Sequence, residues 1–128
     1  MLNDTLSNAL SKLLDYEKIS RKECTVKSSK ILKKVLEIMH NNGYVGSYEE
    51  IKSIRGNELK VNLIGAINNC GVIKPRFSVE AGNYTKFERR YLPAQDFGVL
   101  IVSTSLGIMT HDDAKKNRTG GKLIAFCY

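Results

Sequence analysis

The segment that most constrains this chain is an apolar run that ends in hydroxyl residues. Val99–Val102 is short, apolar and rich in β-branched side chains, which predicts a buried strand. Ser103, Thr104 and Ser105 follow at its end, and Gly107 lets the backbone turn before a helix begins. We expect this arrangement to hold short hydrogen-bonding side chains still on a rigid support.

The first half of the chain predicts the order α-β-α-β-β. Apolar residues recur at spacings of three and four from Leu2 to Leu14, as in an amphipathic helix capped by Asn3 or Asp4. Residues 23–27 are best interpreted as a strand, although a loop is an alternative. The elements expected here are a helix ending near Lys18, a strand over 23–27, a helix capped by Ser28-Ser29 and stopped by Asn41-Asn42-Gly43, and antiparallel strands over 44–54 and 59–63 around a turn at 55–57.

The second half predicts mostly antiparallel strands and a short helix. Asn68–Gly71 is the clearest boundary, so we expect an α+β protein of two subdomains, residues 1–67 and 68–128. Residues 83–91 fit either a short helix or an irregular turn. The other features expected are extended segments over 72–79, a loop over 93–96, a helix capped by Thr110 and stopped by Gly120-Gly121, and a final strand over 122–128 with Leu123, Ala125 and Cys127 on one face and Ile124, Phe126 and Tyr128 on the other.

The charge balance points to a polyanionic partner. The formal net charge is +7, and eight Lys and Arg between Lys12 and Lys34 face only three acids. A solvated face normally mixes both signs, so the surplus favours a polyanionic partner over a merely soluble basic surface. No apolar run approaches the roughly 20 residues of a membrane helix, and Met1–Asp4 lacks the layout of a signal peptide. We therefore expect a cytoplasmic protein without a membrane partner.

Motifs for catalysis or metal binding are missing from the sequence. Cys24, Cys70 and Cys127 form no Cys-x-x-Cys pair, which predicts buried thiols and no metal site. The chain has neither a Gly-x-Ser-x-Gly elbow nor a Gly-x-x-x-x-Gly-Lys-Ser/Thr loop. Ser103, His111 and Asp112 make a poor hydrolytic set, because neighbours along one turn rarely point at one another. We expect no catalytic residue, no cofactor and no small-molecule substrate.

The helix that follows Ser29 begins with positive charges, which are unfavourable at a helix N-terminus. The helix after Ser29 carries Lys30, Lys33 and Lys34 in its first turns, where the helix dipole disfavours positive charge. A phosphate bound to the free backbone amides and to Lys30 would reverse that cost. We interpret Ser29, Lys30 and Lys33 as a phosphate-binding site; lysines that simply extend into solvent are the alternative.

Two further groups of residues have both a structural and a functional interpretation. Ser and Thr side chains often hydrogen-bond the local backbone at strand ends, which is the structural interpretation of Ser103, Thr104 and Ser105. Next to a basic surface, we favour contacts of these hydroxyls with bases and riboses. Aromatic residues interleave with basic ones between Lys74 and Phe97, either as a base-stacking platform or, more commonly at this spacing, as core. Arg76, Arg89 and Arg90 are candidate contacts to an RNA backbone.

Several segments together resemble the small-subunit ribosomal protein eight family. The stretch from Gly98 to Lys115, followed by Gly120-Gly121-Lys122-Leu123, is similar to the family's signature. The resemblance extends along the whole chain, and Thr5 departs from a proline common in the family. The other matching segments are Asn3–Leu10, Ser29-Lys30, Asn42–Val45, Ile73–Phe77 and Arg90–Ala94. The last two resemble the archaeal and eukaryotic branch of the family rather than the bacterial one.

The resemblance implies a two-domain protein that binds the central domain of small-subunit rRNA early in assembly, among neighbouring ribosomal proteins. It implies that Ser103, Thr104, Ser105 and Gly107 contact an irregular internal loop, and that Ser29 and Lys30 grip the RNA backbone. We add Lys33, Arg76 and Lys122 as RNA-binding candidates and expect the two patches to clasp one RNA jointly. A free regulator that recognises an mRNA copy of this RNA shape is the alternative function.

Overall fold

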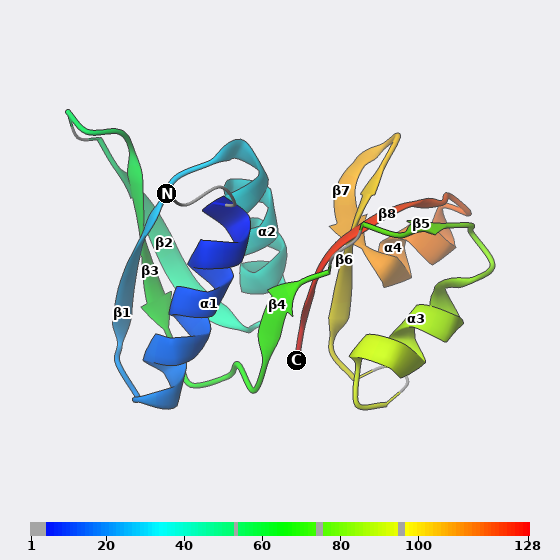
Figure 1. Cartoon of the computed structure of the whole chain (residues 1–128), viewed down its shortest axis with the longest axis horizontal. Coiled ribbons are helices and arrows are strands. Elements are labelled where there is room, and N and C mark those ends of the chain that lie inside the picture. The colour runs from blue at the N-terminus through cyan, green and yellow to red at the C-terminus, as the bar shows by residue number, and fades with distance from the viewer. Residues whose placement is uncertain (1–4, 53, 74–75, 95–96) are drawn as a thin grey trace. The chain divides into compact units, whose positions relative to one another are not determined.

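The computed structural model describes residues 5–52, 54–73, 76–94 and 97–128 (Figure 1). The chain divides into two compact units, Met1–Cys70 and Gly71–Tyr128. Each unit combines helices with an antiparallel sheet, so the predicted α+β class is confirmed. The helix cap at Asn3 or Asp4, the residues Lys74 and Pro75, and the end of the 93–96 loop lie outside the described residues.

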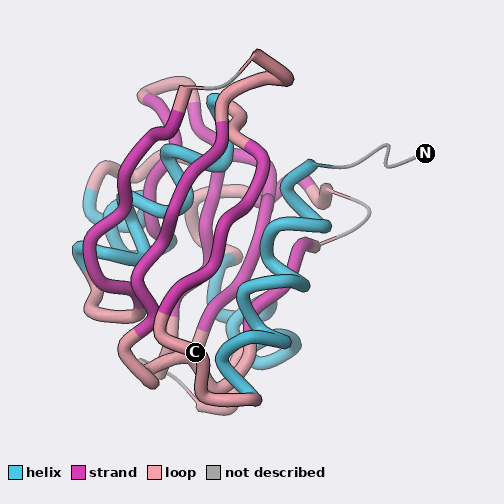
Figure 2. The backbone as a smooth tube through the Cα atoms, turned by 90° about the vertical axis from the view of Figure 1, so that its left-hand side faces the viewer, coloured by secondary structure: helices cyan, strands magenta, loops and turns pink. Residues whose placement is uncertain are grey.

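The first unit packs two helices on a three-stranded sheet in the order β1-β3-β2 (Figure 1), and Figure 2 faces this sheet. Burial along the central strand alternates, so one face of the sheet is apolar and the helices cover it. The helices contribute leucines such as Leu10, Leu13 and Leu36 to this core. The elements are α1(Thr5–Lys18), β1(Glu23–Lys27), α2(Lys30–Asn41), β2(Val45–Ile51) and β3(Glu58–Leu63).

The expected order of this unit is confirmed, with β1 as the strand rather than the loop. Ser29 caps α2, and Gly43 takes the left-handed conformation (φ +79°) just past its end, as expected. The second strand is shorter than 44–54, because β2 ends at Ile51.

The second unit is a five-stranded antiparallel sheet with two short helices (Figure 1). Its strand order is β4-β8-β6-β7, and β5 also pairs with β8. Tyr84 and Phe87 pack against Leu100, Val102 and Leu123 in its core. The elements are β4(Cys70–Val72), β5(Ser78–Val79), α3(Tyr84–Tyr91), β6(Val99–Thr104), β7(Gly107–Thr110), α4(His111–Lys116) and β8(Gly121–Cys127). Segment 83–91, which fitted either a helix or a turn, forms the helix α3.

A strand that we did not predict, β7, follows the hydroxyl residues. Ser103 and Thr104 belong to β6, and the chain turns through Ser105-Leu106 directly into β7. The expectation that a helix follows the glycine turn was therefore incomplete, since a strand intervenes before Thr110 caps α4. Four residues are too few to show a clear alternation in sequence.

The predicted faces of the last strand were wrong because its pairing with β6 contains a bulge. Ile101 pairs with Ala125 but Val102 pairs with Leu123, so Ile124 is an extra residue. The bulge shifts the alternation by one position. Leu123 consequently packs in the same core as Phe126, instead of sharing a face with Ala125 and Cys127.

The glycine pair does not stop the preceding helix. Helix α4 ends at Lys116, and Arg118 takes the left-handed conformation (φ +51°) after it. Gly121 instead begins β8. Within the described residues, no helix is long and apolar enough to span a lipid bilayer.

Candidate nucleic-acid interface

The hydroxyl residues lie on a tight β-hairpin of the second unit. Thr104 pairs with Gly107 across the hairpin, and Ser105-Leu106 form its two-residue turn. Gly107 has a φ of +122°, which an L side chain rarely adopts, so this turn needs a glycine. The Leu106 side chain is 65% exposed at the tip.

The three hydroxyls have different roles. The Thr104 hydroxyl donates to the Gly107 carbonyl at 2.8 Å and accepts from the Leu106 N–H at 3.1 Å, which rigidifies the turn. Ser103 and Ser105 are exposed, and no partner for either hydroxyl occurs among the described residues. These two serines are therefore the hydroxyls available to a ligand, while Thr104 supports them.

Cross-strand pairing brings Lys122 next to Ser103. Ser103 on β6 lies opposite Lys122 on β8, and Lys122 lies opposite Ser78 on β5. Directly opposed residues project from the same face of a sheet, and all three are exposed. The result is a polar row of two hydroxyls and a cation. Sequence reasoning missed Ser78, because nothing in the sequence indicates the pairing of β5 with β8.

Gly120 and Gly121 allow the backbones to approach closely behind this row. A Cβ on Gly121 would lie 2.3 Å from the Ser103 carbonyl oxygen. A Cβ on Gly120 would lie 2.5 Å from the Val79 carbonyl oxygen. Both distances are shorter than real Cβ contacts, so only glycine fits. The glycine pair thus lets β8, which carries Lys122, lie close to β6, which carries Ser103.

The start of α2 in the first unit has the geometry expected of an anion site. Ser29 is extended (φ −149°, ψ 161°), and its hydroxyl accepts from the Leu32 N–H at 3.1 Å. This bond satisfies one N–H of the first turn and leaves those of Lys30 and Ile31 facing outward. The first turn contains no acid, and the Lys30 side chain is exposed beside it.

Lys33 is less available than its position in the sequence indicated. Its ammonium lies 2.9 Å from a Glu50 carboxylate oxygen on β2. Hydrogen bonding to Lys33 lowers the pKa of Glu50 below its usual value. The cost of a lysine at this helix start is therefore partly offset inside the protein, and Lys30 is the stronger candidate for a phosphate contact.

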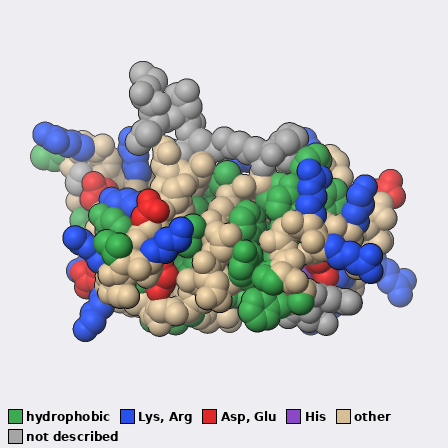
Figure 3. Space-filling view, turned by 60° about the horizontal axis from the view of Figure 1, so that its bottom comes forward, with side chains coloured by type: hydrophobic (Ala, Val, Ile, Leu, Met, Phe, Trp, Pro, Cys, Tyr) green, Lys and Arg blue, Asp and Glu red, His purple; other side chains and the backbone are tan. Residues whose placement is uncertain are grey.

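The aromatic and basic segment is divided between core and surface. Tyr84 and Phe87 are buried, in agreement with the core interpretation, whereas Phe97 is half exposed. The Arg90 guanidinium stacks over the rings of Phe77 and Tyr91 at 5.1 and 5.6 Å from their centroids. Arg76 and Arg89 are also exposed. On the face shown in Figure 3, basic side chains stand among acidic ones rather than forming one patch.

The cysteines are free and buried, as expected. The Cys70 thiol donates to the Leu10 carbonyl at 3.5 Å. Burial, together with the neighbouring Glu17 carboxylate, raises the pKa of Cys70 to about 12. Such a thiol carries almost no thiolate near neutral pH and cannot act as a nucleophile.

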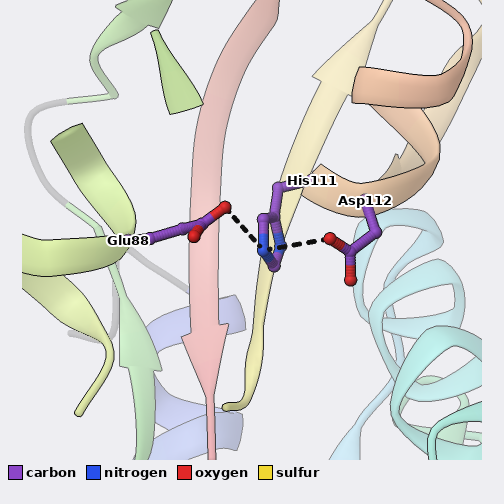
Figure 4. A group of neighbouring side chains, drawn as sticks. All are labelled: Glu88, His111 and Asp112. Atoms are coloured by element: carbon purple, nitrogen blue, oxygen red, sulfur yellow. Dashed lines mark ion pairs between the residues drawn. The ribbon is translucent and has the colours of Figure 1, made fainter. Parts of the chain in front are cut away.

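An ionisable cluster built on the buried residues Glu88 and His111 lies between α3 and α4 (Figure 4). His111 Nε2 lies 3.2 Å from a Glu88 carboxylate oxygen and 3.6 Å from one of Asp112. Lys115 contacts the same Glu88 oxygen. His111 and Asp112 thus do point at one another, so our reason for rejecting a hydrolytic set was wrong. His111 is only 1% exposed, however, whereas Ser103 is exposed on β6.

This cluster does not suit a metal ion either, although its three ligand atoms lie within 4.8 Å of one another. The Leu100 N–H donates to His111 Nδ1 at 3.0 Å, so Nδ1 carries no proton. The neutral ring must then carry its proton on Nε2, which faces Glu88. A protonated Nε2 has no lone pair for a metal, and Lys115 already neutralises the carboxylate. The cluster ties α3 and α4 to the start of β6.

Comparison with known proteins places the whole chain in one family. The ribosomal protein S8 family model matches residues 4–128. The small ribosomal subunit protein uS8 of the archaeon Archaeoglobus fulgidus is 46% identical over 126 residues, which cover 98% of each chain. This confirms the family resemblance expected from the sequence, and the expectation of a protein that is not an enzyme. The chain belongs to the ribosomal protein S8 family.

Proposed function

We propose that this protein is a structural constituent of the small ribosomal subunit, in the cytoplasm, that binds the central domain of small-subunit rRNA directly and supports early assembly. The observation that carries the proposal is the pair of exposed hydroxyls, Ser103 and Ser105, on a hairpin held by Thr104. The cation of Lys122 lies opposite Ser103. RNA is read mostly at irregular elements whose bases are splayed, and short rigid hydroxyls can reach both a base edge and a 2′-hydroxyl there.

The two units have complementary roles in this proposal. The subdomain over 68–128 supplies recognition through its hairpin, with Arg76 as a backbone contact. The subdomain over 1–67 supplies affinity, because the α2 amides and Lys30 offer phosphate a positive site at Ser29. Phosphate contacts orient a protein on RNA without reading sequence, whereas contacts to base edges specify the site.

Footprinting with Ser105→Ala tests the recognition step on a transcript of an archaeal small-subunit rRNA central domain. We expect loss of protection at one internal loop and about a 3- to 10-fold weaker affinity, the usual size of one hydrogen bond. Ser11→Ala, at an exposed serine on α1, is the control and should bind like the wild type. An unchanged footprint for Ser105→Ala would contradict the assignment of the hairpin.

Salt titration tests the backbone contact. Lys30→Gln should weaken binding and lower the slope of log K against log salt by about 0.7. Lys33→Gln should lower it less, because Glu50 already pairs with Lys33. An unchanged slope for Lys30→Gln would remove the phosphate site at α2.

Co-sedimentation separates this function from that of a free RNA-binding regulator of translation. A ribosomal constituent should sediment with small subunits at physiological salt. Recovery only in the free fraction, together with binding to an mRNA that copies the rRNA shape, would favour the regulator instead.

A further inference from the structure

A groove between α1 and β1 in the first unit is not used by the proposed function. One part of it is a pocket of about 360 Å³ with an apolar floor at Ala9 and Val26. Lys12, Lys27 and Arg55 stand around it, against the single acid Glu58. A second hollow shares Lys12 and Thr25 with the first. Its other lining residues are Tyr16, Arg21, Lys22 and Glu23.

Lys12 is held at the middle of this groove. Its ammonium donates to the Thr25 carbonyl at 2.7 Å and lies 5.5 Å from the centre of the Tyr16 ring. Arg21 stacks near the same ring at 5.3 Å. An ammonium has three donors, and the Thr25 carbonyl uses one of them. The lysine is therefore ordered in advance for an acceptor that enters the groove, which lowers the entropic cost of binding.

The outer edge of β1 also faces the groove. β1 is an edge strand (Figure 1). The Lys22 carbonyl accepts from the Leu63 N–H, and the Ser28 N–H donates to the Asn57 carbonyl just before β3. Even-numbered residues of this segment therefore bond toward β3, and the backbone groups of Thr25 and Lys27 point away from the sheet. These two N–H groups add donors to the cations along the groove.

We propose that this groove binds one unpaired nucleotide of the RNA, with its phosphate on Lys12 and Arg55 and its base on the apolar floor. The proposal rests on the proposed function, since it adds a contact to the same RNA. The pocket volume of about 360 Å³ lies within the range of small-ligand sites and is too small to hold an RNA duplex. A nucleotide that is splayed out of the helix is the form in which RNA reaches such a pocket.

The same groove suits an acidic peptide less well. A peptide that extends the sheet needs the acceptors of the strand edge as well as its donors. Lys12 already occupies the Thr25 carbonyl, the central acceptor of β1, and a charged residue at an edge opposes strand addition. A phosphate needs donors only.

The test compares Lys12→Gln/Arg55→Gln with Lys18→Gln/Lys116→Gln, which removes two exposed cations outside the groove. Each phosphate contact contributes about 0.7 to the salt slope, or roughly fourfold at 0.15 M salt. On the central-domain transcript we expect the groove variant to bind about 10- to 20-fold more weakly and to lose about 1.4 from the slope. The affinity of the control variant should fall less than threefold. Lys12→Arg should retain most of the wild-type affinity.

Footprints distinguish the possible failures. The groove variant should expose one unpaired nucleotide while the internal loop stays protected. If the wild type binds the transcript but the groove variant matches the control in affinity and slope, the groove proposal fails and the proposed function stands. A wild type that does not bind would overturn both.

Amide shifts of the isotope-labelled wild type then test the ligand class. Decauridylate should move the Thr25 and Lys27 signals and decaglutamate should not. Movement with decaglutamate alone would overturn the assignment to RNA.

Discussion

Replacement of Gly121 by alanine should destabilise the second unit and its hydroxyl strand. The new Cβ would lie 2.3 Å from the Ser103 carbonyl oxygen and 2.9 Å from Val102 Cγ1. Ordinary contact begins at 3.4 Å, so β6 and β8 must separate by about 1 Å. Overpacking of this kind costs about 1–3 kcal/mol, and one weakened backbone hydrogen bond adds about 1 kcal/mol. We expect the free energy of unfolding to fall by about 2–4 kcal/mol.

Urea unfolding followed by far-UV circular dichroism measures this change. Gly82→Ala is the matched control, because a Cβ at Gly82 meets nothing within 4 Å and its φ is not in the left-handed region. The control should stay within about 0.5 kcal/mol of the wild type or be slightly more stable. If Gly121→Ala unfolds at the same urea concentration as Gly82→Ala, the close approach of β8 to Ser103 is not a constraint and the reasoning fails.

Three other outcomes follow from the same structure. Thr104→Val should cost about 1–2 kcal/mol, since it removes the hydroxyl bonds that close the turn at Gly107, and should weaken RNA binding; chemical denaturation and filter binding measure both. Cys70, whose pKa burial raises to about 12, should resist iodoacetamide at pH 8 in the native protein and react once urea unfolds it; rapid native labelling would contradict its burial. His111→Phe should cost about 1–3 kcal/mol, because the buried Leu100 N–H loses its acceptor; unchanged stability would show that this bond is unimportant.

Strong local signals were sufficient to predict the first unit. Apolar spacing, the Ser29 cap and the glycine at position 43 specify α2 within the chain itself. The alternation at Leu59, Val61 and Leu63 likewise predicts β3 correctly. Each of these signals depends on neighbours a few residues away, which a sequence displays directly.

Contacts between distant segments account for most of what was missed. Glu50 reaches Lys33 from another element and alters the apparent anion site at α2. His111 and Glu88 meet although 23 positions separate them, and the sequence contains no motif for this pair. Pairing of β5 with β8 adds Ser78 to the candidate surface.

The sequence by itself determined the fold class, the family resemblance and the chemistry of the hydroxyl residues, because each depends on residue types and on their spacing over short stretches of the chain. Only the tertiary structure decided which hydroxyls are available and which cation stands beside them. The bulge at Ile124 shifts β8 by one residue, so that Lys122 rather than Leu123 lies opposite Ser103. A shift of one residue reverses the face of every side chain that follows, and the register is set by packing across strands far apart in the chain.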